Sequence, residues 1–160
     1  MRRAVLGLAL LLAALPVGGC AGSPLRPEAS AEVRLWRTDF AIDRDALLAA
    51  IDGWQACGLD LDACWQALAR VEVRSAILSR IDSPSHPNVV DDHLLPPPRC
   101  LGTADQLAME ATMTISRGAR AGWDAYENGN LSEIGVAQTE VYRGRGQLAA
   151  ATRLVDAAAC

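Results

Sequence analysis

Lysine is absent from this 160-residue chain, and histidine and aromatic residues are scarce. All 15 basic residues are arginine, against 19 acidic residues, so the formal net charge is −4 at neutral pH. No run of basic residues interrupts this acidic composition. Because nucleic-acid binding depends on the neutralisation of phosphates by lysine and arginine, we expect no nucleic-acid partner.

Several motifs of metal and cofactor chemistry are missing as well. No two of the five cysteines are separated by two residues, which excludes the zinc-ribbon spacing and the covalent haem motif. No Glu-x-x-His sequence occurs, so a ferritin-like di-iron bundle is not indicated. We therefore expect no cofactor and no enzymatic activity, with one alternative considered below.

The longest apolar run lies at the amino terminus. Two arginines follow Met1, and an almost wholly apolar stretch runs from Ala4 to Val17 before Gly18 and Gly19. This order of charged, apolar and small residues is typical of a secretory signal peptide. The stretch is too short for a transmembrane helix, which needs about 20 apolar residues.

The end of this segment, Val17-Gly18-Gly19-Cys20, resembles the lipobox of bacterial lipoproteins. The resemblance covers residues 1–20 only. It implies that residues 1–19 are cleaved, and that Cys20 is acylated on its thiol and on the new amino group. Ala21 stands where an inner-membrane retention signal would have Asp, so the resemblance implies the outer membrane, facing the periplasm. Several acyl chains, at about 0.8 kcal/mol per buried methylene group, form a stable anchor.

The mature chain divides into a tether and one folded domain. Residues 20–37 are predicted to be a lipidated amino terminus and flexible tether, because prolines and small residues give the segment little core potential. Residues 38–160 are predicted to form a single helical domain, in which a proline-rich link occupies residues 83–99. Pro96, Pro97 and Pro98 should keep part of that link extended.

Four helices are expected from apolar residues that recur at intervals of three and four. The first is capped by Asp39 or Asp43 and runs to about Cys57, and the second runs from Asp60 to about Ile81. A third starts after Thr103, and a fourth follows the turn at 128–130. The predicted fold class is all-α, a small four-helix bundle made of two disulfide-stapled helical hairpins. Gly144 and Gly146 in the last helix predict a close helix contact or a bend.

The cysteines remaining after Cys20 should form disulfides in an oxidising compartment. Cys57 ends the first helix and Cys64 opens the second, so a tight hairpin brings them together. Cys100 precedes the third helix and Cys160 ends the fourth, so both lie at the same end of the second hairpin. The predicted pairs are therefore Cys57–Cys64 and Cys100–Cys160.

Few residues are candidates for binding or chemistry. The four tryptophans could stack on glycan rings or on a partner. Trp54 and Trp65 fall on apolar helical stripes and are expected in the core, whereas Trp36 precedes the expected helices and is the better exposed, partner-binding anchor. A different hypothesis places a metal or catalytic site in the proline-rich link, at the cluster formed by His86, Asp91, Asp92 and His93.

Two functions follow from these observations as hypotheses. The first is an outer-membrane lipoprotein that acts as a non-enzymatic accessory or binding module, of the envelope-assembly, secretion-system or immunity type. It would be held to the membrane by its lipid and would bind a periplasmic protein or peptidoglycan. The alternative is a small envelope hydrolase or metal-binding protein that uses the histidine-containing link.

Overall fold

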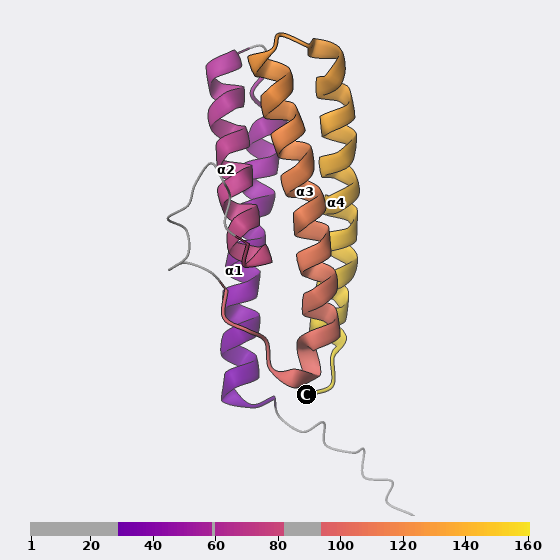
Figure 1. The fold of residues 1–160 in the computed structure, drawn as a ribbon. Helices are drawn as coiled ribbons and strands as arrows, with labels where there is room; N and C mark the ends of the chain where they lie inside the picture. Colours follow the sequence, from indigo (N-terminus) through magenta and orange to yellow (C-terminus); the bar gives the residue numbers. More distant parts are fainter. Residues whose placement is uncertain (1–28, 59, 82–93) are drawn as a thin grey trace, which may run out of the picture.

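A computed structural model describes residues 29–58, 60–81 and 94–160. Within these ranges the chain forms the helices α1 (Ala31–Gln55), α2 (Leu61–Ser79), α3 (Gly102–Glu127) and α4 (Leu131–Ala157). A short 3-10 helix, η2 (Arg99–Leu101), precedes α3. Consecutive helices run in opposite directions in an elongated bundle (Figure 1). The predicted all-α fold and its two helical hairpins are confirmed.

The expected cap of the second helix and the two expected turns are confirmed. The side chain of Asp60 caps α2, since its Oδ1 accepts a hydrogen bond from the backbone N–H of Ala63 at 3.0 Å. Gly58 and Gly129 adopt positive φ values of 62° and 64° in the two interhelical turns. This left-handed backbone suits glycine, which has no Cβ to clash with the following carbonyl group.

The start of α1 corrects the sequence-based boundary of the tether. The helix begins at Ala31, capped by Ser30, rather than at Asp39 or Asp43, so residues 31–37 are helical and not a tether. The reason is tertiary burial, because the core extends to both Val33 and Trp36. Their spacing continues the helical period of the residues that follow. The alternation of apolar and polar residues in this segment, which would indicate an extended conformation, is weak.

The two helices of the second hairpin approach closely through glycine. A Cβ atom on Gly144 would lie 2.6 Å from Cγ1 of Ile115 and 2.9 Å from two backbone atoms of α3. A Cβ on Gly118 would lie 2.8 Å from Cγ2 of Val141. The close contact predicted at Gly144 is therefore confirmed, with Gly118 as its counterpart on α3.

The described part of the proline-rich link is held against the bundle at its exit. Leu94 is buried, and its backbone N–H donates to the carbonyl oxygen of Ile77. Arg80, which ends α2 with a φ of 55°, donates from Nε to the Leu94 carbonyl oxygen at 2.8 Å and from its two terminal nitrogens to Asp105 at 2.6 and 2.9 Å. Asp105 is only 4% exposed, so this pair ties α2 and the link to the first turn of α3.

Both predicted disulfides are present. Cys57 and Cys64 bridge the turn between α1 and α2, with their Cα atoms 5.1 Å apart. Cys100 and Cys160 join η2 to the end of the chain, with their Cα atoms 5.7 Å apart. Each bridge therefore closes one hairpin, as the sequence-based reasoning required.

Among the helices that the structure describes, none is both long enough and apolar enough to cross a membrane.

Candidate functional site

The bundle has two chemically different ends. The distal end carries both tight turns, between α1 and α2 and between α3 and α4, whereas the proximal end carries the start of α1 and the end of α4 (Figure 1). At the proximal end, Arg37 on α1 donates a hydrogen bond to the carbonyl oxygen of Ala158 at 2.8 Å. The Cys100–Cys160 disulfide lies at this same end.

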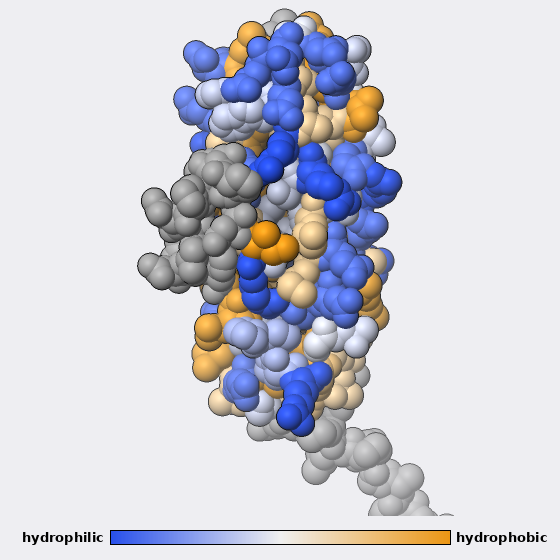
Figure 2. Space-filling view, in the orientation of Figure 1, coloured by the Kyte–Doolittle hydropathy of each residue, from blue (hydrophilic) through white to orange (hydrophobic). Residues whose placement is uncertain are grey.

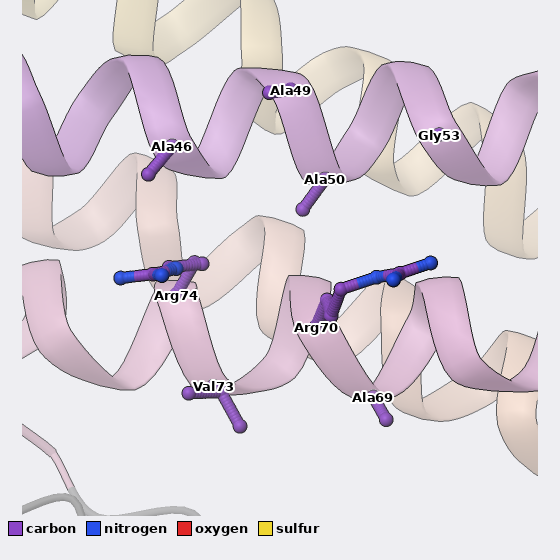
Figure 3. A pocket seen from close by; sticks show the side chains of 8 residues that line it. All are labelled: Ala46, Ala49, Ala50, Gly53, Ala69, Arg70, Val73 and Arg74. Atoms are coloured by element: carbon purple, nitrogen blue, oxygen red, sulfur yellow. The ribbon is translucent and has the colours of Figure 1, made fainter.

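A groove of about 470 Å³ lies between α1 and α2 (Figure 3). Its α1 side consists of small residues, of which Ala46 and Ala50 point toward α2, whereas Ala69 and Val73 of α2 point away from α1. Arg70 and Arg74 lie along the groove and point in opposite directions (Figure 3). Neither arginine forms an ion pair with any residue that the structure describes. The groove therefore combines an apolar lining with two available positive charges.

A second, smaller pocket of about 290 Å³ lies at the distal end, lined by Leu61, Asp62, Trp65, Tyr126 and Glu127. Trp65 was expected in the core and that prediction is wrong, since this indole is 39% exposed. The neighbouring Cys64 is fully buried, and one residue along a helix turns the side chain by about 100°. The distal pocket thus has an aromatic wall and two carboxylates.

The aromatic wall is held by stacking. The rings of Trp65 and Trp123 lie with centroids 4.1 Å apart and planes tilted by 34°. Such offset aromatic pairs are favourable beyond the area that they bury. Trp123 and Tyr126 pack in turn against the core, so the exposed indole rests on a fixed support. Sequence reasoning missed the pair because it assigned Trp65 to the apolar stripe of α2.

Charge is distributed unevenly along the bundle. Two distal segments, residues 45–69 and 121–142, contain no basic residue and eight carboxylates: Asp45, Asp52, Asp60, Asp62, Asp124, Glu127, Glu133 and Glu140. Arginines just outside these segments pair with Asp45, Asp52 and Glu140. Among the described residues no ion pair involves Asp62 or Glu127. The distal pocket therefore carries two carboxylates that no described arginine neutralises.

Trp36 does not form the exposed anchor expected from the sequence. It is 4% exposed, stacks on Phe40 with ring centroids 5.2 Å apart, and donates a hydrogen bond from Nε1 to the carbonyl oxygen of Leu95 at 2.9 Å. The prediction failed because α1 starts earlier than expected, which places Trp36 on the inner face of that helix. Its role is to hold the exit of the proline-rich link against α1.

The other candidates lie outside the described residues. These are the lipidation site at Cys20 and the cluster formed by His86, Asp91, Asp92 and His93. Within the described ranges, no three His, Cys, Asp or Glu side chains are grouped so that they could hold a metal ion. The described surface offers the distal pocket and the α1–α2 groove as candidate sites, besides a smaller pocket of about 170 Å³ between α3 and α4.

Figure 2 shows that the face of the bundle turned toward the viewer is largely hydrophilic, with apolar side chains in small separate areas. No family model, no curated protein and no solved structure matches this chain.

Proposed function

We propose that this protein is a non-enzymatic binding module, held by a lipid on Cys20 at the periplasmic face of the outer membrane, and that it presents its distal end to an envelope partner. The lipobox-like sequence supports the anchor, and the short segment between Cys20 and Ser30 supports a position close to the bilayer. A chain of about ten such residues reaches roughly 20 Å.

The observation that carries this proposal is the separation of the two ends of the bundle. Helix α1 starts at the proximal end, next to the disulfide that fixes the end of the chain, and the aromatic pocket lies at the opposite end. The 27 residues of α4 correspond to a length of about 40 Å at 1.5 Å per residue. An anchored protein of this form holds its distal pocket well clear of the membrane surface.

In-cell photocrosslinking tests the proposal. A photoreactive amino acid replaces Gln66, which is exposed on α2 beside the distal pocket, or Asp156, which is exposed near the proximal end of α4. The proposal predicts a reproducible envelope partner captured from position 66 and not from position 156, in an outer-membrane fraction. Equal capture from both positions, or a protein recovered entirely in the soluble fraction, would contradict it.

A Cys20→Ser variant, exported with an ordinary cleavable signal peptide in place of residues 1–19, provides the matched test of the anchor. It should fold with the same melting temperature as the native protein, because residue 20 precedes the first described helix in the sequence, but should move from the membrane to the soluble periplasmic fraction. A variant that stays bound to the membrane would contradict the proposal that a lipid on Cys20 anchors the protein.

A further inference from the structure

The distal pocket has the chemistry of a site for a positively charged group. Its wall is aromatic, formed by the half-exposed indole of Trp65 together with Tyr126, and its rim carries the carboxylates of Asp62 and Glu127. Aromatic faces attract cations through their quadrupoles, and carboxylates do so through their charge. No basic side chain lines the pocket, so nothing within it neutralises these carboxylates.

The surrounding charge acts in the same direction. Beside the two carboxylates that line the pocket, Asp60, Asp124 and Glu133 lie in the two distal segments and form no ion pair among the described residues, so they add negative charge near the pocket. At physiological ionic strength the field of such charges extends about 8 Å, so the closest of these carboxylates reinforce the attraction at the pocket itself. An acidic ligand or an anionic polymer would be repelled from the same surface.

The pocket is small and open to solvent. Its volume of about 290 Å³ is at the lower end of the range for small-molecule sites. A single extended side chain with a charged head can occupy it. The planar guanidinium group of arginine stacks on aromatic rings while its nitrogens donate to carboxylates, and lysine provides the charge alone.

We propose that the distal pocket binds a cationic side chain, arginine in preference to lysine, that projects from an exposed basic segment of a protein partner. Trp65 supplies the stacking surface, and Asp62 and Glu127 accept hydrogen bonds from the guanidinium group. This inference rests on the proposed function for its cellular setting, since it names the class of partner that the anchored module would hold. The binding itself requires no lipid anchor.

The test uses the purified full-length protein in a non-ionic detergent. The probe is a seven-residue peptide with two arginines among glycines and serines, and its counterpart carries citrulline, which has nearly the same shape without the charge. Calorimetry and indole fluorescence should show binding of the arginine peptide, at least tenfold weaker binding of the citrulline peptide, and loss of affinity with added salt. Equal binding of the two peptides, or no binding of either, would overturn the proposal.

Two sets of variants assign the binding to the pocket. The double variant Asp62→Asn, Glu127→Gln should bind the arginine peptide at least tenfold more weakly. Its melting temperature should be nearly unchanged, because both side chains are exposed. The pair Asp39→Asn and Asp156→Asn removes the same charge from exposed positions outside the two distal segments and should leave the affinity unchanged. Equal effects of the two double variants would show a general charge effect and no pocket.

Trp65→Ala separates a cation site from a glycan site. It should lower the affinity for the arginine peptide at least tenfold, whereas Tyr142→Ala, which removes an exposed ring elsewhere, should leave that affinity unchanged. A tetramer of N-acetylglucosamine serves as the glycan probe. If this sugar bound in a manner that depended on Trp65 but not on the two carboxylates, the pocket would be a carbohydrate site and the proposal would be wrong.

The outcomes distinguish this inference from the proposed function. A protein that is lipidated and crosslinks from position 66, but binds no arginine peptide, would refute only the cationic partner. A protein that binds the arginine peptide through Trp65 but carries no lipid would refute only the anchored module.

Discussion

At the scale of single residues, the packing of the bundle depends on a few positions at which one added methyl group would cause a steric clash. Gly118 and Gly144 face each other's helices at distances that leave no room for a methyl group, so α3 and α4 approach as closely as their backbones allow. Gly146, only two residues from Gly144, has no atom within 4 Å of where a Cβ would lie. Gly144 and Gly146 should therefore respond to the same substitution in opposite ways.

Gly144→Ala should destabilise the protein by about 1–3 kcal/mol, because the new methyl group meets Ile115 and the backbone of α3. Gly146→Ala should stabilise it by up to about 1 kcal/mol, since alanine is the better helix former and the position is open. Urea unfolding of both variants checks the prediction. Two changes of the same sign would mean that the helices are further apart than described.

The pair formed by Arg80 and Asp105 is one of the ion pairs that link the two hairpins, together with Arg120–Glu72 and Arg145–Asp52. Asp105 is almost fully buried, and its carboxylate takes two charge-assisted hydrogen bonds from one guanidinium group. A buried charge that loses its partner is strongly unfavourable, whereas an exposed pair contributes little.

Arg80→Ala should therefore lower the free energy of unfolding by about 3 kcal/mol. Arg143→Ala, which removes an exposed partner of Glu140, should change it by less than about 1 kcal/mol. Chemical denaturation measures both. Adding Asp105→Ala to Arg80→Ala should recover part of the loss, and a double variant no more stable than the single one would contradict this explanation.

At the scale of elements, most of the fold could be predicted from periodicity, caps and cysteine positions. Asp60, Gly58 and Gly129 mark the turns through local chemistry that a sequence displays directly. The start of α1 could not be predicted in this way, because Trp36 becomes helical through burial against the link, and Leu95 is 59 residues away. Long-range contacts of this kind leave no local signal.

The two disulfides close loops of very different length, with cysteines separated by 7 and by 60 residues. In the chain-entropy model, replacing Cys100 and Cys160 with serine should cost about 4 kcal/mol, and replacing Cys57 and Cys64 should cost about 2 kcal/mol. Thermal or urea unfolding of the two double variants measures the difference. If removing the Cys57–Cys64 bridge lowered the free energy of unfolding more than removing Cys100–Cys160, native packing around Cys64 would contribute more to stability than the entropy of the unfolded chain.

At the scale of the whole molecule, the asymmetry between the two ends is what connects fold to function. The disulfide pairs and the hairpins could be derived from the sequence, but the distal pocket could not, because it depends on which side of α2 faces outward. Trp65 and Tyr126 come from different hairpins and meet only when α2 packs against α3. The sequence shows that the carboxylates are unevenly distributed along the chain, but only the folded structure brings the two carboxylate-containing segments side by side.

Intact-mass spectrometry of the native protein, purified from membranes without reducing agent, tests the central claim most directly. The account predicts a chain that begins at Cys20, carries acyl groups on that residue, and has its remaining four cysteines joined as Cys57–Cys64 and Cys100–Cys160. A chain with an unmodified residue 20 and four free thiols would contradict both the anchor and the stapled body.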